Sequence, residues 1–227
     1  LVVQKKRRPF GPSFFLNNKQ TGSRQFSLHR RGEFADGLGL MERTQAMELL
    51  REYTQSESLI KHALAVEAAM RHYAGLLDGD VEEWGLTGLL HDFDYERWPE
   101  EPEHTREGSK ILQERGVGEE VIGAILSHAE WNREEYPLDR PIRKALFAVD
   151  ELTGFIFAVT YVRPSRSIQE VTPRSVKKKL KQKSFAASVN RDDIFQSIEE
   201  LGVDLTEHIQ FVIDALVEKA HELGLAG

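Results

Sequence analysis

Histidines gather in one part of this 227-residue sequence and stand among apolar residues. Five of the eight histidines fall between Leu59 and Trp131, and four of those five lie beside apolar neighbours. His62 shares the apolar side of an expected helix with Leu59 and Val66. An imidazole buried without a partner is costly. We therefore expect His62 to have one, either a backbone carbonyl, as in an ordinary core histidine, or a metal ion.

Two carboxylates stand at equally unusual places. His91 and Asp92 are adjacent, so both side chains can converge on one ion only at the end of a helix. Asp150 lies within the apolar stretch FAVDELTGFIF, where a carboxylate is destabilising unless it is paired or bound to a metal. The alternative for Asp150 is a salt bridge to Arg143 or Lys144. Imidazole and carboxylate together suit Zn, Mn, Fe or Mg.

The composition limits the chemistry that is available. With no cysteine, disulfides, thiolate zinc sites and cysteine nucleophiles are excluded. A metal must therefore be held by nitrogen and oxygen atoms. No segment approaches the roughly 18 to 20 consecutive apolar residues of a membrane span, and the first residues lack the apolar run of a secretory signal. We expect a cytoplasmic protein with no membrane partner.

The charge and the apolar period both divide the chain near residue 40. Residues 1–40 carry eight Lys or Arg and two acidic residues, a net charge of +6, which leaves −13 for the rest of a chain whose total is −7. Three interpretations of 1–40 stay open: a disordered basic arm, a targeting peptide, or upstream sequence ahead of a start at Met41, which we favour. Residues 41–227 predict a single compact all-α domain without repeats or strands.

The elements that must position these side chains are helices. Asp80 is expected to cap the helix that leads into His91, and Ser56 or Ser58 the helix that carries His62. The helix around Asp150 is expected to be buried with a charged centre, whereas residues 163–190 are basic and polar. We treat His72, His208 and His221 as surface residues and place His29 in the basic arm. The expected helices cover about 47–53, 59–77, 81–90, 105–115, 119–130, 141–162, 192–201 and 205–223.

The order and spacing of the chemical residues resemble a known signature. His62, then His91 and Asp92 about thirty residues later, then Asp150, is similar to the histidine, histidine-aspartate, aspartate pattern of the HD superfamily of phosphohydrolases. An isolated HD dipeptide would carry almost no weight, but here all four residues fall on expected helices. The resemblance implies an HD-domain helical bundle and a metal-dependent phosphohydrolase.

The resemblance is closer to the bacterial HDIG type and implies two further ligands. In that type HD is followed by a histidine in an EHxxxG segment, here EHTREGSKIL, which supplies His104, and by another near the end of the next helix, here His128 in GAILSHAEW. The sequence departs from the type in that HDFD replaces HDIG and Tyr95 stands where a lysine is common. The ligands implied for one or two ions, with Asp92 as the bridge, are His62, His91, Asp92, His104, His128 and Asp150.

The expected reaction is hydrolysis of a phosphate ester by metal-activated water. The substrate class is a phosphomonoester or phosphodiester, as in a nucleotide or a small phosphorylated metabolite. We assign catalytic roles to Asp92, Asp94 and Glu151, although Asp94 and Glu151 could instead orient a liganding histidine. The metal is not distinguishable among Mn, Fe, Zn, Mg and Ni.

The basic segment 163–190 is the second informative feature. Its cations suit phosphate or nucleic acid, although a solvated lysine face is the common explanation. DELTG, VRPS, SVKKK and KSFAA in this order are similar to one bacterial branch of HD hydrolases. Two alternatives to hydrolysis stay open: a non-catalytic nucleotide-binding or RNA-binding protein with a structural metal site, and a di-iron oxygenase. The substrate-binding residues we expect are Arg163, Arg166, Lys178 and Lys181.

Overall fold

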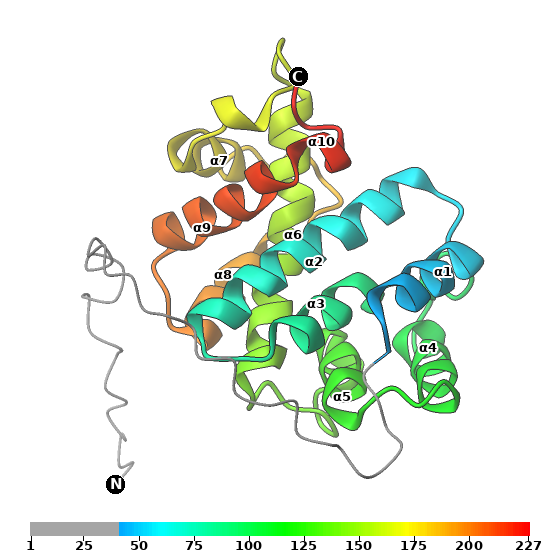
Figure 1. Cartoon of the computed structure of the whole chain (residues 1–227). Coiled ribbons are helices and arrows are strands. Elements are labelled where there is room, and N and C mark those ends of the chain that lie inside the picture. Colours follow the sequence, from blue (N-terminus) through cyan, green and yellow to red (C-terminus); the bar gives the residue numbers. More distant parts are fainter. Residues whose placement is uncertain (1–40) are drawn as a thin grey trace, which may run out of the picture. The chain divides into compact units, whose positions relative to one another are not determined.

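The structure, a computed structural model, describes residues 41–227. The segments with an apolar period in this part of the chain fold into helices (Figure 1). The prediction of an all-α fold is confirmed, with ten α-helices and no strand in the described part. Predictions for residues 1–40 lie outside it. The helices are α1 Arg43–Tyr53, α2 Glu57–Leu76, α3 Val81–Leu90, α4 Glu103–Glu114, α5 Glu119–His128, α6 Pro141–Tyr161, α7 Pro173–Leu180, α8 Arg191–Leu201, α9 Leu205–Glu218 and α10 Ala220–Leu223, with 3-10 turns η1 Glu130–Asn132 and η2 Ile168–Glu170.

Polar side chains fix where several of these helices begin. Asp80 Oδ1 accepts hydrogen bonds from the backbone nitrogens of Glu82 and Glu83, both at 2.9 Å, which confirms the predicted cap of α3. Ser56 stands at the N-cap of α2, but its hydroxyl makes no capping bond and pairs with the Ser58 hydroxyl instead. The start of the site-bearing helix α3 is therefore fixed by local sequence, whereas that of α2 depends more on packing.

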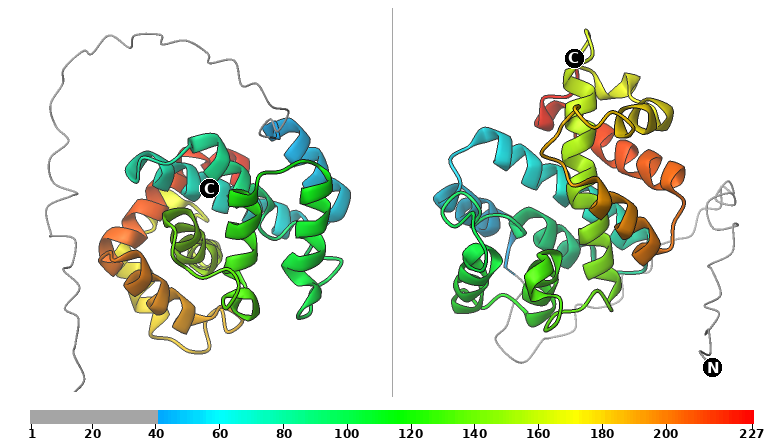
Figure 2. Two further views of the ribbon diagram at one scale, coloured as in Figure 1. Left: turned by 90° about the horizontal axis from the view of Figure 1, so that it is seen from below. Right: turned by 180° about the vertical axis from the view of Figure 1, so that it is seen from behind.

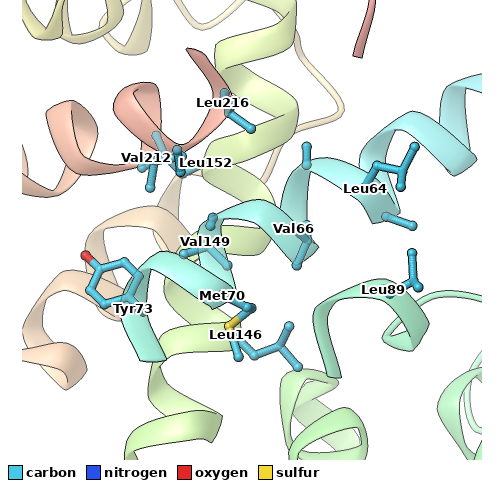
Figure 3. Close-up of a cluster of buried hydrophobic side chains, with 14 of the residues drawn as sticks. Leu64, Val66, Met70, Tyr73, Leu89, Leu146, Val149, Leu152, Val212 and Leu216 are labelled. Atoms are coloured by element: carbon cyan, nitrogen blue, oxygen red, sulfur yellow. The ribbon is translucent and has the colours of Figure 1, made fainter. Parts of the chain in front are cut away.

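Helix α6 is the centre of the bundle. Seen from below it runs nearly along the line of view, with the other helices around it (Figure 2). It packs against α2, α5, α8 and α9. One buried cluster joins these elements, and Figure 3 draws part of it, including Met70 and Val66 of α2, Leu146 and Val149 of α6, and Leu216 of α9. This long central helix thus holds Asp150 at the middle of the fold.

Helices α2 and α3 approach each other so closely that only glycine fits at one point. A Cβ placed on Gly88 would lie 2.8 Å from the Val66 carbonyl oxygen and 2.9 Å from the Glu67 Cα. Such a contact is far inside the normal separation of about 3.5 to 4.0 Å between carbon atoms. Gly88 therefore sets the spacing between the helix that carries His62 and the helix that ends at His91.

His208 is not the surface residue that we predicted. It is only 1 % exposed, its Nδ1 lies 2.5 Å from the Tyr73 hydroxyl, and its Nε2 lies 2.9 Å from the Ala148 carbonyl oxygen. The charged neighbours of His208 in the sequence pointed to a solvated face, but on a helix they lie on the other side. His208 thereby joins α9 to α2 and α6.

Among the described helices, none combines the length and the apolar character that crossing a bilayer requires.

Candidate metal centre

Six imidazole and carboxylate side chains from five helices converge near the middle of α6. His62 comes from α2, Asp150 from α6, and His91 with Asp92 from the end of α3, where His91 is the C-cap residue. His104 lies at the start of α4 and His128 is the last residue of α5. Their ligand atoms form two groups, each within 4.8 Å, that share Asp92.

The first group contains His62, His91, Asp92 and Asp150. Asp150 Oδ1 lies 3.0 Å from His62 Nε2 and 3.5 Å from His91 Nε2. The two Nε2 atoms are 3.3 Å apart, and His91 Nε2 is 3.5 Å from Asp92 Oδ2. Two ligands bound to one divalent ion at about 2.0 to 2.2 Å lie about 3.0 to 3.5 Å apart, so these separations fit a single coordination shell.

The second group contains Asp92, His104 and His128. The Nε2 atoms of both histidines lie 3.3 Å from Asp92 Oδ1. That oxygen is buried, yet no described residue donates a hydrogen bond to it. A buried carboxylate oxygen without a donor is rare. A cation between the three atoms would satisfy it.

Backbone carbonyls orient two of the histidines. His91 Nδ1 lies 2.8 Å from the carbonyl oxygen of Gly88, and His128 Nδ1 lies 2.6 Å from that of Ile125. A carbonyl only accepts, so in both rings Nδ1 carries a proton and donates it, and Nε2 faces the group. This is the usual arrangement of metal-ligating histidines.

Side chains orient the other two histidines, His62 and His104. Thr153 donates its hydroxyl to the Asp150 carbonyl oxygen at 2.8 Å, so it can only accept from His62 Nδ1, 3.4 Å away. His104 Nδ1 lies 3.1 Å from Asp94 Oδ1. All four rings therefore present Nε2 to the interior of the two groups. The carbonyl partner that was the alternative for His62 is thus replaced by the Thr153 hydroxyl, and His104 is buried, at only 5 % exposed.

A strained turn aims His104 inward. The residues His104 and Thr105 break the helical geometry of α4, and Thr105 has φ of +67°. A positive φ is a genuine outlier for a β-branched residue and persists only where the surroundings enforce it. Here the Asn132 side-chain nitrogen donates to Thr105 Oγ1 at 2.9 Å. The amide of Asn132 thus helps to hold the turn that presents His104.

The carboxylates and imidazoles perturb one another strongly. Burial lowers the pKa of His91, but Asp92 and Asp150 raise it more, to about 9. Burial also lowers the pKa of His104, and Asp92 and Asp94 raise it to about 10. For Asp92 burial acts to raise the pKa, yet the neighbouring imidazoles of His91, His104 and His128 hold it well below its ordinary value. The centre therefore favours cationic charge beside its carboxylates.

The alternative explanation for Asp150, a salt bridge to a neighbouring cation, is excluded by the packing. Arg143 donates to the Pro137 carbonyl and to Asp139, and Lys144 donates to the Glu200 carbonyl. Asp150 instead meets His62 and His91, as described above.

The two further carboxylates that we assigned to catalysis have other neighbours. Asp94 is buried, its Oδ1 faces His104, and its Oδ2 accepts from the Gly108 backbone nitrogen at 2.9 Å. This position supports the alternative that Asp94 orients His104. Glu151 accepts from the Asn190 backbone nitrogen at the start of α8, and burial followed by Asp150 raises its pKa to about 7. Its catalytic role stays a prediction.

The basic residues that we expected to bind substrate lie elsewhere. Arg163 follows Asp150 by thirteen positions, which is about 20 Å along a helix axis. Arg166 follows in the segment between α6 and η2, and Lys178 and Lys181 line a cavity beside α7, which lies at the end of α6 away from α3 and α5 (Figure 1). None of the four belongs to the two ligand groups, and their role in binding substrate stays a prediction.

Two aromatic residues beside His104 were not predicted from the sequence. The rings of Tyr95 and Trp131 have their centroids 5.2 and 6.0 Å from that of His104. Tyr95 is 40 % exposed, whereas the Trp131 indole nitrogen is buried and has no partner among the described residues. Tyr95 follows Asp92 by three positions in the chain, and Trp131 follows His128 by three. This spacing was the signal in the sequence that could have pointed to them.

Comparison with known proteins agrees with this geometry. The model of the family described as "HD domain" matches residues 59–152, a span that contains all six converging side chains. No curated protein and no solved structure gives a significant match to the chain. The sequence resemblance and the helical bundle are thus confirmed at the level of the domain. Residues 59–152 form an HD domain, the domain that defines the HD superfamily of metal-dependent phosphohydrolases.

Proposed function

We propose that this protein hydrolyses a phosphate ester at a centre that holds two divalent ions. The observation that carries the proposal is the position of Asp92, whose two oxygens face the two ligand groups separately. Oδ2 lies beside His91 Nε2, and Oδ1 lies beside His104 and His128 Nε2. A carboxylate that spans two groups in this way is suited to bridging two ions, as in enzymes that clamp a phosphate from both sides.

The chain's own residues fit this chemistry. Ions held in the centre supply an activated water and neutralise charge that develops on the phosphoryl oxygens. The four histidines have Nδ1 engaged outside the two groups and turn Nε2 toward them, so they would bind the ions as neutral ligands through Nε2. Asp92 and Asp150 contribute two negative charges, which offset part of the charge of two cations.

The substrate that we propose is a phosphomonoester or phosphodiester, either a nucleotide or a small phosphorylated metabolite. Tyr95 supports the nucleotide case, since its exposed ring lies edge-on to His104, next to the second ligand group. An exposed aromatic ring can stack on a base, a contact worth about 1 to 3 kcal/mol. Asp94 pairs with His104 Nδ1 and itself accepts from the Gly108 backbone nitrogen, so the ring of Tyr95 has a fixed neighbour in His104.

The test uses the purified full chain loaded in turn with Mn, Fe, Zn, Mg or Ni. Phosphate release is followed on a panel of nucleoside monophosphates, cyclic and linear diesters, and sugar phosphates. We expect activity with at least one metal and one ester, and its loss in Asp92→Asn and His128→Ala. The matched control is His72→Ala, which removes a histidine whose neighbour is Glu218 rather than a site residue. The proposal would be overturned if wild type released no phosphate with any of the metals, or if Asp92→Asn were as active as wild type.

A second function, binding of nucleic acid, is favoured by one cavity. Arg174, Lys177, Lys178, Lys181 and Thr206 line a hollow of about 400 Å³ between α7 and α9, and no residue of this lining is acidic. Phosphate contacts of this kind weaken as salt concentration rises. We propose that RNA binds there, and that salt-sensitive binding survives Asp92→Ala but is lost in Lys178→Ala with Lys181→Ala. RNA binding that is insensitive to these two lysines would count against the site.

A further inference from the structure

A cavity separate from the metal centre lies between α4, α5 and the segment that leads into α6. Its volume is about 540 Å³, and its lining includes Arg106 and Ser109 of α4, Ile122 and Leu126 of α5, and Arg143 of α6. None of the six residues of the metal centre lines it. Sites for small molecules usually measure about 300 to 1,000 Å³. The cavity is therefore large enough for a metabolite.

Two buried hydrogen-bonding atoms on side chains that line this cavity lack partners among the described residues. Ser109 is 7 % exposed and Arg143 is 8 % exposed. The Ser109 hydroxyl and the Arg143 Nε have no partner among the described residues. Buried polar side-chain atoms almost always have a hydrogen-bond partner. Two such atoms in the lining of one cavity point to a ligand that accepts hydrogen bonds from both.

The guanidinium of Arg143 is held in a defined place. Its Nη1 donates to the Pro137 carbonyl oxygen at 3.0 Å and to Asp139 Oδ1 at 3.2 Å. A Cβ on Gly123 would lie 2.8 Å from Nη2, so the guanidinium rests against the backbone of α5 where only glycine allows it. Glycine is unfavourable inside a helix, and here it makes room for the arginine.

The charges around the cavity favour an anion. Arg106 donates through its Nε to the Asn132 side-chain oxygen at 2.8 Å, and within residues 41–227 its two terminal nitrogens make no other hydrogen bond. The lining holds four cations, Arg106, Lys110, Arg140 and Arg143, against three acidic residues, Glu119, Glu120 and Glu135, and Glu120 is already paired with Arg140. A planar guanidinium binds carboxylate and phosphate groups well because its N–H donors match their oxygens. The apolar side chains of Ile122 and Leu126 leave a surface for the rest of the ligand.

We propose that this cavity binds a small molecule that carries one oxyanion head, a carboxylate or a phosphoryl group, on an apolar body. Ser109 and Arg143 bind the head, and Arg106 completes its neutralisation. Because the lining excludes the metal ligands, the site is independent of the proposed hydrolysis, and either proposal can fail alone.

The experiment titrates the full chain with benzoate, for a carboxylate head, and with phenylphosphonate, for a phosphoryl head, by isothermal calorimetry. We expect at least one probe to bind wild type with one site per chain. Ser109→Ala should weaken that binding by about tenfold or more, which is the usual loss of a hydrogen bond to a charged group. Gly123→Ala, which displaces the Arg143 guanidinium, should weaken it similarly.

The matched control is Ser197→Ala, because the Ser197 hydroxyl is also buried but donates to the Ile194 carbonyl of its own helix. It should leave probe affinity unchanged. Ser109→Ala should melt at the same temperature as free wild type or higher, since it removes an unpartnered hydroxyl. A serine with only a structural role would change melting and not affinity. Binding of neither probe to wild type, or binding as tight as that of wild type in both Ser109→Ala and Gly123→Ala, would overturn the proposal.

Discussion

The contact at Gly88 offers the sharpest test of how the fold positions the metal centre. Gly88 lies against the backbone of α2 at Val66 and Glu67, and its carbonyl oxygen accepts from His91 Nδ1. Gly88→Ala would therefore push apart the helices that carry His62 and His91. Two effects are expected from one methyl group: a loss of stability and a displaced ligand.

The magnitude follows from the distances. An added Cβ 2.8 Å from the Val66 oxygen and 2.9 Å from the Glu67 Cα must move outward by about 0.5 to 1 Å to reach ordinary contact. Overpacking of this kind costs about 1 to 3 kcal/mol. The gain from replacing glycine by alanine in a helix is about 1 kcal/mol. Gly154→Ala in α6 has the same gain and no atom within 4 Å of its Cβ, so it is the matched control.

The difference between the two variants isolates the clash. At about 2 to 4 °C per kcal/mol for a domain of this size, Gly88→Ala should melt roughly 2 to 12 °C below Gly154→Ala. Metal affinity should fall in Gly88→Ala alone, because ligand distances tolerate only about 0.2 Å. Calorimetric melting and metal titration measure both effects. If Gly88→Ala melts as high as Gly154→Ala and binds metal like wild type, our account of the α2 and α3 contact is wrong.

Three further outcomes follow from the site and the core. Asp94→Ala frees His104 and should weaken the binding of one ion by roughly 10-fold to 100-fold in a metal titration, and an unchanged affinity would remove its orienting role. Burial lowers the pKa of His208 from 6.5 to about 4, so folded stability is full above pH 6.5 and falls as the pH drops toward 4. Urea unfolding at about pH 7 and about pH 5 should show a smaller loss for His208→Gln than for wild type. In metal-free protein the pKa of His91 is raised from 6.5 to about 9. The stability that this histidine contributes is therefore full below pH 6.5 and should decline as the pH rises toward 9 in melting scans. A melting temperature that does not change over this range would contradict the pairing of His91 with Asp92.

The sequence was most informative where a polar residue interrupts an apolar pattern. Asp150 within α6 and His62 within α2 stand on otherwise apolar faces, and the structure brings them within 3.0 Å of each other. Periodicity also predicted the position of α6 closely, since burial on nearly every side leaves a continuous apolar run. Such residues can be recognised in a sequence because burying a polar group in a core is unfavourable unless a partner compensates for it.

The sequence was least informative where tertiary contacts override local preference. The turn at Thr105 depends on Asn132, which lies 27 positions further along the chain, and no local signal indicates a positive φ at a threonine. His208 looked solvated because its neighbours are charged, but its partner Tyr73 is 135 positions away. Helix α7 was not among the expected helices, because only Val176 and Leu180 of its residues are buried and its apolar pattern is short. Each error concerns a contact between distant segments.

Metal content of the full chain tests the central claim most directly. After loading with a divalent ion and removal of the excess, elemental analysis should find two ions per chain in wild type, one for each ligand group that shares Asp92. Asp92→Ala should lose both, because each group loses a ligand, whereas His72→Ala should retain both. Wild type that holds no ion, or Asp92→Ala that still holds two, would contradict the account.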